Sequence, residues 1–187
     1  MFQVILLFML SVPLSGCLLL NDVNSISAVY LMTPPPDRAI VIFGLSVEGE
    51  IDPHAATFNP GFFEIGLDEY SIEREHITGD CWRYNKMRAK VPGIMGTHQY
   101  FAFDVKPGYY VATRLIGLNN PKISRKSLVF EVPPGKIVYL GDFIWTTEAA
   151  VELKRDPNDV RSLFGEGVLL ADTRQGSQYP GAVLCVI

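Results

Sequence analysis

The sequence of 187 residues lacks several features on which common protein functions depend. It has no excess of positive charge, because 16 Lys and Arg residues stand against 20 Asp and Glu residues, a net charge of −4. This balance argues against non-specific nucleic-acid binding, which needs a basic surface. The chain contains no glycine-rich phosphate loop, no G-x-S-x-G motif and no H-E-x-x-H motif. With 48% hydrophobic residues and only 19% charged ones, it is long and apolar enough for one globular domain with its own core.

Potential metal ligands and reactive thiols are also few. The histidines are His54, His76 and His98, and no two of them have the tight spacing that is typical of zinc ligands. Cys81 is not surrounded by a recognisable catalytic motif. We therefore predict no catalytic residue, no metal site and no cofactor, and we expect a protein that is not an enzyme.

Long hydrophobic runs are missing as well. The block Val4–Val12 holds nine residues, whereas a membrane-spanning helix needs about 20 apolar residues. Nine residues is the length of the hydrophobic region of a signal peptide. Pro13 then interrupts the helix, and the small residues Ser15 and Gly16 stand directly before Cys17.

The residues Leu14-Ser15-Gly16-Cys17 resemble the lipobox of bacterial lipoproteins. In that family the cysteine thiol receives a diacylglycerol, and the chain is cut before the cysteine. The resemblance implies a signal peptide over residues 1–16, lipidation of Cys17, and a membrane-anchored protein on the extracytoplasmic side of the cell envelope. Leu18 stands where inner-membrane retention usually shows aspartate, which favours the periplasmic face of the outer membrane if the cell is Gram-negative.

Turn signals divide the remaining chain. Residues 17–38 include three consecutive prolines and predict a tether, with a possible short strand around Ala28–Met32. From residue 39 to residue 187, turns rich in Gly, Pro and Asn are separated by 12 to 18 residues. This spacing is typical of strands in an antiparallel β-sandwich or barrel. The fold class is therefore predicted as mainly β, an antiparallel β-sandwich with one short C-terminal helix.

Alternating apolar side chains locate individual strands. The pattern predicts strands at residues 98–105, 127–132 and 136–145. In the last of these, it places Tyr139 and Phe143 on the same face of the sheet.

Helical periodicity appears near residues 157–164. Asp156 is the expected N-cap, and Gly165 is expected to end the helix. The stripe that should face the core consists of Val160, Leu163 and Phe164.

Two segments, 103–111 and 130–143, share a Pro-Gly turn followed by a strand with tyrosine. They resemble the small β-sandwich domains of bacterial envelope proteins related to carboxypeptidase-regulatory-like and transthyretin-like modules. The resemblance implies the fold and assigns no catalytic residue.

An acidic run over residues 68–75 and a basic run over residues 83–90 flank a predicted turn at Thr78–Asp80. We predict two antiparallel strands with Glu73 opposite Lys86, and Glu69 opposite Lys90 in the same register. The charges would then pair across a solvated face; a docking patch of one charge sign is the alternative.

Two further site predictions concern thiols and aromatic residues. Lipidation leaves Cys81 and Cys185 as the remaining thiols, and an envelope compartment permits a disulfide between them; two separate buried thiols are the alternative. Trp82 and Tyr84 are candidates for an aromatic contact surface.

The expected function is a non-catalytic interaction or structural role, with an envelope protein or the cell wall as partner, and the alternative is binding of a small ligand or a glycan.

Overall fold

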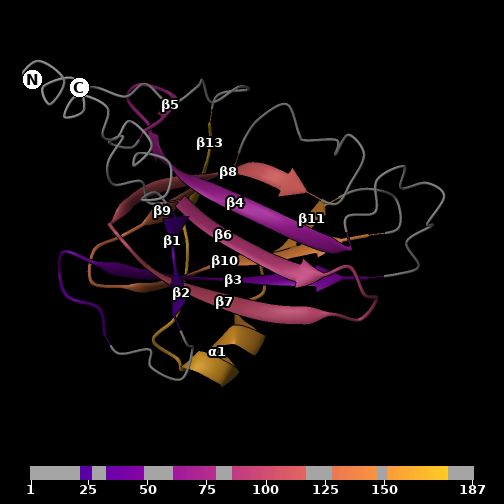
Figure 1. Ribbon diagram of the computed structural model, residues 1–187. Helices are drawn as coiled ribbons and strands as arrows, with labels where there is room; N and C mark the ends of the chain where they lie inside the picture. Colours follow the sequence, from indigo (N-terminus) through magenta and orange to yellow (C-terminus); the bar gives the residue numbers. More distant parts are fainter. Residues whose placement is uncertain are drawn as a thin grey trace, which may run out of the picture.

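The computed structural model describes residues 22–26, 33–48, 61–78, 86–116, 128–146 and 151–176. These residues form two packed β-sheets with one helix outside them (Figure 1). The predicted fold class, a mainly β sandwich with one short helix, is confirmed. Three predicted strands match their alternating pattern to within one residue at each end, because a Pro-Gly turn adjoins at least one end of each.

Sheet A runs from an N-terminal strand at one rim to a C-terminal strand at the other. Its pairs are antiparallel except for β1 with β6. In spatial order the strands are β1 (Asp22–Val23), β6 (Lys86–Pro92), β4 (Phe62–Ser71), β8 (Gly108–Ile116), β9 (Leu128–Val132) and β13 (Thr173–Gln175), and β5 (His76–Ile77) also pairs with β4.

Sheet B lies against sheet A and contains the most deeply buried strand. Its central strand β3 pairs in parallel with β10 and antiparallel with β7. In spatial order the strands are β11 (Val151–Lys154), β10 (Ile137–Trp145), β3 (Ala39–Val47), β7 (His98–Val105) and β2 (Ser25–Ile26), and β12 (Leu169–Leu170) also pairs with β10.

The main core fills the space between the two sheets with aromatic and branched side chains. The ring of Phe43 stacks on Phe103 at 5.4 Å between centroids and meets the edge of Phe143 at 6.0 Å. Trp145 is fully buried beside Phe63. Such rings bury large apolar areas, and this burial is the main favourable term that holds the sheets together.

Helix α1 (Asn158–Phe164) covers part of the outer face of sheet B, the face that points away from sheet A (Figure 1). Val160 is fully buried there against Ile40 and Ile42 of β3. Strand β3 is therefore buried on both faces, which explains why its residues are apolar apart from Ser46.

The predicted helix is confirmed, with two corrections. The N-cap is Pro157 and not Asp156, although Oδ1 of Asp156 still accepts a hydrogen bond from the backbone N–H of Asn158 at 3.1 Å. Leu163 does not face the core, because its side chain is 63% exposed. Gly165 ends the helix as expected, with φ at 100° and its N–H bonded to the Arg161 carbonyl.

The charged segments are neighbouring antiparallel strands, as predicted, but the predicted register is wrong. Glu64, and not Glu69, lies opposite Lys90. Glu73 lies in a tight turn at residues 72–75 instead of in a strand opposite Lys86. The turn at residues 72–75 begins before the predicted turn at Thr78–Asp80. Strand β4 therefore ends earlier than expected, and its register with β6 differs from the predicted one.

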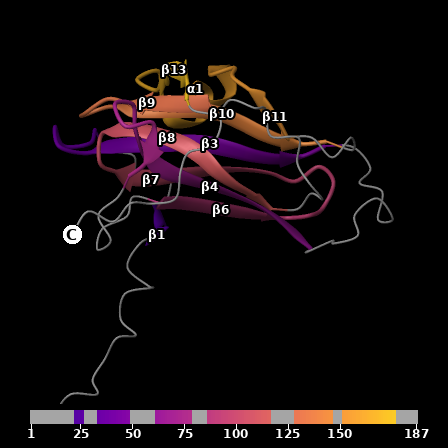
Figure 2. The same ribbon diagram turned by 90° about the horizontal axis from the view of Figure 1, so that it is seen from above.

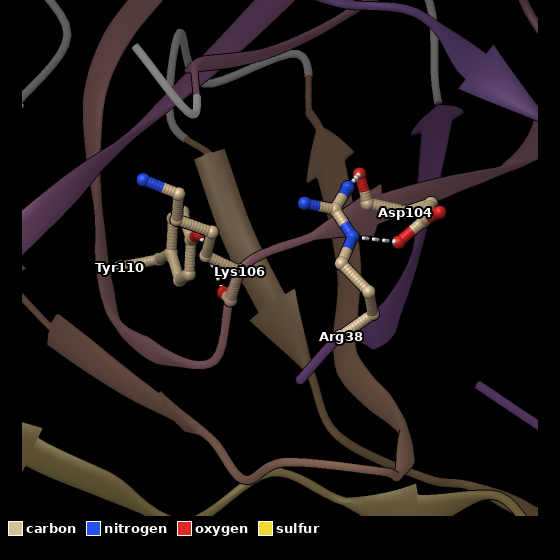
Figure 3. Close-up of polar contacts among 4 residues, drawn as sticks. All are labelled: Arg38, Asp104, Lys106 and Tyr110. Atoms are coloured by element: carbon tan, nitrogen blue, oxygen red, sulfur yellow. Dashed lines mark hydrogen bonds and ion pairs between the residues drawn. The ribbon is translucent and has the colours of Figure 1, made fainter. Parts of the chain in front are cut away.

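Two side-chain contacts hold the end of the sandwich where β7 turns into β8 (Figure 3). Nε of Arg38 donates to Oδ1 of Asp104 at 2.8 Å, and Nη2 donates to the Asp104 carbonyl at 2.8 Å. The Tyr110 hydroxyl donates to the Lys106 carbonyl four residues earlier, also at 2.8 Å. The second contact has the form of a tyrosine corner, which fixes a strand-to-strand connection in sandwich folds.

Residues 22–26 belong to the body of the sandwich. Strand β1 pairs with β6 of sheet A, and after Asn24 the chain pairs as β2 with β7 of sheet B. Part of the segment predicted as a tether is thus paired with both sheets. The possible strand around Ala28–Met32 lies outside the described residues.

Candidate functional site

Several residues that the sequence marks as sites lie outside the part of the chain that the structure describes. Their predicted roles in lipidation, disulfide formation, aromatic contact and metal binding therefore stay predictions. These residues are Cys17, Cys81, Cys185, Trp82, Tyr84 and His54.

The other two histidines lie on different sheets, His76 in β5 of sheet A and His98 in β7 of sheet B. Among the described residues, no three His, Cys, Asp or Glu side chains are grouped so that they could hold a metal ion. In the same residues, no helix is long and apolar enough to cross a membrane.

The outer face of sheet B carries a group of polar side chains beside α1. Asp142 of β10 lies opposite Gly44 of β3, and Gly44 lies opposite Tyr100 of β7, so the three residues form a row across three strands. Tyr139 precedes Asp142 on the same strand and belongs to the same outer face. We call Tyr100, Tyr139, Asp142 and the neighbouring His98 the polar cluster.

A β-bulge in β10 aims Asp142 at this face. The register with β3 shifts between Tyr139 and Asp142. Gly141 has a φ of 134°, a backbone conformation that residues other than glycine rarely adopt. Because the bulge reverses the alternation, Tyr139 faces outward and Phe143 faces the core. The prediction that Tyr139 and Phe143 share a face is therefore wrong.

Gly44 provides the space for the Asp142 carboxylate. A Cβ atom at this position would lie 2.8 Å from Cγ of Asp142 and 3.1 Å from Cε1 of Tyr100, and still closer to Oδ1 of Asp142. The carboxylate therefore occupies the place where any other residue would put its side chain. Position 44 has to be glycine as long as Asp142 is packed in this way.

The polar cluster is largely buried and its hydrogen bonding is incomplete. Asp142 is only 7% exposed and Tyr139 is fully buried. The Tyr139 hydroxyl and the Asp142 carboxylate interact with each other, whereas the buried hydroxyl of Tyr100 has no hydrogen-bond partner among the described residues. Nε2 of His98 lies 3.9 Å from Oδ1 of Asp142, so a protonated imidazole would place a cation beside the carboxylate. Buried polar groups are normally satisfied, so the Tyr100 hydroxyl marks a place where a polar molecule would be stabilised.

Burial sets the electrostatics of the cluster. It raises the pKa of Asp142, although the Tyr139 hydroxyl and the charges of His98 and Lys154 favour the carboxylate. Burial also raises the pKa of Tyr100 to about 12, and the negative charge of Asp142 adds to the increase. The cluster can therefore donate a hydrogen bond through the Tyr100 phenol, accept one through the Asp142 carboxylate, and attract a positive group.

Aromatic rings form one wall of the cluster. The ring of Phe164 in α1 meets the Tyr100 ring edge-on at 5.7 Å between centroids, and the centroid of the His98 ring lies 4.7 Å from that of Tyr100. His98 is exposed to solvent and borders the buried groups. Access to the cluster is therefore expected from the His98 side.

The sequence analysis did not identify this cluster. A usable signal was present, because an isolated glycine inside a strand pattern, here Gly141 before Asp142, indicates a bulge that can turn a polar side chain to the other face. Which residues the bulge brings together depends on the β3 and β7 registers, which the alternation does not reveal.

Comparison with protein-family models, with curated proteins and with solved structures finds no match to this chain.

Proposed function

We propose that the protein is a lipid-anchored protein of the cell envelope with a non-catalytic interaction or structural role. The observation that carries this proposal is the sequence Leu14-Ser15-Gly16-Cys17 behind a short hydrophobic block, placed five residues before the first strand of a β-sandwich. Two or three acyl chains on Cys17 would hold the protein to a membrane stably, whereas a single chain binds only marginally.

Two buried or half-buried charged groups hold the sandwich itself together. Asp68 is buried on sheet A and contacts Lys86 at 3.3 Å, and the Thr113 hydroxyl donates to its other oxygen. The Arg155 guanidinium donates to the carbonyls of Leu140 in β10 and of Ala171 between β12 and β13. These groups therefore have partners within the fold.

The test compares the full chain with Cys17→Ser, and with Ser15→Ala as a control that keeps a small residue before the cysteine. Wild type and Ser15→Ala should incorporate labelled palmitate and partition into the detergent phase, while Cys17→Ser should do neither. A Cys17→Ser variant that still partitions with membranes, or a wild-type protein without label, would contradict the proposal.

The polar cluster favours a second candidate function, the binding of a small polar ligand. The buried Tyr100 hydroxyl, which has no hydrogen-bond partner among the described residues, lies close to the Asp142 carboxylate and to the exposed His98. Ligand-detected NMR with a panel of sugars and small amines should find a ligand whose saturable binding is lost in Asp142→Asn. Binding should be retained in Glu152→Gln, which changes an exposed residue of β11. Equal binding by both variants would contradict this candidate.

A further inference from the structure

The N-terminal strands hold the chain at one rim of the sandwich. Asp22 lies opposite Lys86 at the start of β6, and Ser25 lies opposite Phe103 of β7. Val23 packs against the core between the sheets, and Ile26 packs against the cluster under α1. Strands β1 and β2 therefore close the side between β6 and β7, and Asp22 is the first residue of the sandwich that the structure describes.

The connection from Cys17 to this rim is short. Five residue steps separate Cys17 from Asp22, and a chain of this length reaches about 18 Å at most in any conformation. A lipid on Cys17 therefore keeps Asp22 within about that distance of the bilayer surface. The opposite rim lies farther from Asp22 than Cys17 can, because six strands spaced about 4.8 Å apart span about 24 Å.

The two rims can be seen in Figure 2, where β1 and β6 lie at one side and β11 and β13 lie at the other. We infer that the anchored protein stands on its β1–β2 rim, with this rim against lipid headgroups and with β11 and β13 directed away from the bilayer. This inference rests on the proposed lipid anchor and adds the orientation that the anchor imposes.

The side chains at the rim fit a headgroup layer. Asn24 and Ser25 are exposed and polar, so the rim is suited to contact headgroups without entering the hydrocarbon. The adjacent strand β6 exposes Arg88 and Lys90, and the far rim exposes Lys154 of β11 and Arg174 of β13. Both rims therefore carry cations that anionic lipids attract, and the short connection from Cys17 is what favours the β1–β2 rim.

The orientation also determines which surfaces a partner can reach. The far rim with β11 and β13 is directed away from the membrane, and the outer face of sheet B with the polar cluster stays open at the side. A soluble partner or the cell wall would therefore meet these surfaces, and contacts at the β1–β2 rim would compete with lipid.

The test measures the distance of each rim from the bilayer. The full lipidated chain carries a fluorescent amino acid at Asn24 or at Glu152, both of which are exposed. The protein is reconstituted in vesicles of phosphatidylethanolamine and phosphatidylglycerol that contain a lipid with a spin-labelled headgroup. A control inserts about 20 Gly and Ser residues between Cys17 and Asp22, which adds a mean reach of about 25 Å.

Quenching at Asn24 should be several-fold stronger than quenching at Glu152, and the long-tether control should remove most of this difference. Equal quenching at the two positions, or stronger quenching at Glu152, would overturn the inferred orientation while leaving the anchor intact. If the wild-type chain does not float with the vesicles, the anchor itself is refuted and the orientation with it.

Discussion

Replacing Gly44 by alanine tests the packing of the polar cluster. Gly44 is in the middle of strand β3, where alanine would ordinarily stabilise by about 0.5–1 kcal/mol because it lowers the entropy of the unfolded chain. Here the new methyl group would lie 2.8 Å from Cγ of Asp142 and would overlap Oδ1. The Asp142 carboxylate would have to leave its place, or strands β3 and β10 would have to separate.

The expected cost follows from this overlap. Forcing extra atoms into a packed site typically costs about 1–3 kcal/mol, and the backbone gain offsets only part of that. We therefore expect Gly44→Ala to lower the free energy of unfolding by about 1–2 kcal/mol. In the Asp142→Ala background the same change should cost close to nothing, because only the contact with Tyr100 at 3.1 Å remains.

Urea unfolding followed by circular dichroism measures both effects in a double-mutant cycle. Gly167→Ala is the matched control, because a Cβ atom at Gly167 meets nothing within 4 Å, and it should be neutral or slightly stabilising. The reasoning fails if Gly44→Ala is as stable as wild type, or if its cost is the same with and without Asp142.

Three further predictions concern the same fold. Because burial raises the folded-state pKa of Asp142, its carboxylate destabilises the fold at pH 7 and does so less as the pH falls towards 4. Asp142→Asn should therefore be more stable than wild type by the largest margin at pH 7. A stability margin that grows at low pH in parallel melts would contradict this. Tyr110→Phe removes the hydroxyl bonded to the Lys106 carbonyl and should cost about 1 kcal/mol in urea unfolding, so an unchanged midpoint would refute the role of this contact. Val160→Ala should lower the free energy of unfolding by about 2 kcal/mol, because Val160 is fully buried, and Leu163→Ala should lower it by under about 0.5 kcal/mol, because Leu163 is exposed. Equal losses of stability in the two variants would disprove the docking of α1 on sheet B.

The strands of this protein are predictable where side-chain alternation and turn residues agree. The segment His98–Val105 lies between a turn at Gly96 and the Lys106-Pro107-Gly108 turn, and both of its bounds are read directly from the sequence. The face assignment in β10 fails after Gly141, because one bulged residue reverses the alternation without changing the apolar pattern.

The register of β4 with β6 fails for a different reason. Thr78-Gly79-Asp80 is the stronger turn signal, but the chain turns at residues 72–75, which contain no Gly or Pro. The Ser71 hydroxyl accepts a hydrogen bond from the N–H of Arg74 at 3.2 Å, and Glu75 adopts a φ of 52°. This turn depends on a serine side chain and on a glutamate whose backbone is in the left-handed conformation. Neither feature is among the Gly, Pro and Asn signals by which turns are recognised in a sequence.

The polar cluster is even less predictable, because its members come from three strands that are distant in the chain. Tyr100 and Asp142 meet only through the pairing of β7 and β10 with the same glycine of β3. Neither residue stands in a recognisable motif, so only the strand registers reveal that they are neighbours.

The intact mass of the wild-type protein extracted from membranes shows whether lipid on Cys17 holds the protein to the cell envelope, as we propose. We expect a chain that begins at Cys17 and carries the added mass of a diacylglycerol, with or without a further acyl chain on its amino group. An unmodified chain that still contains residues 1–16, or a shortened chain without lipid, would contradict it.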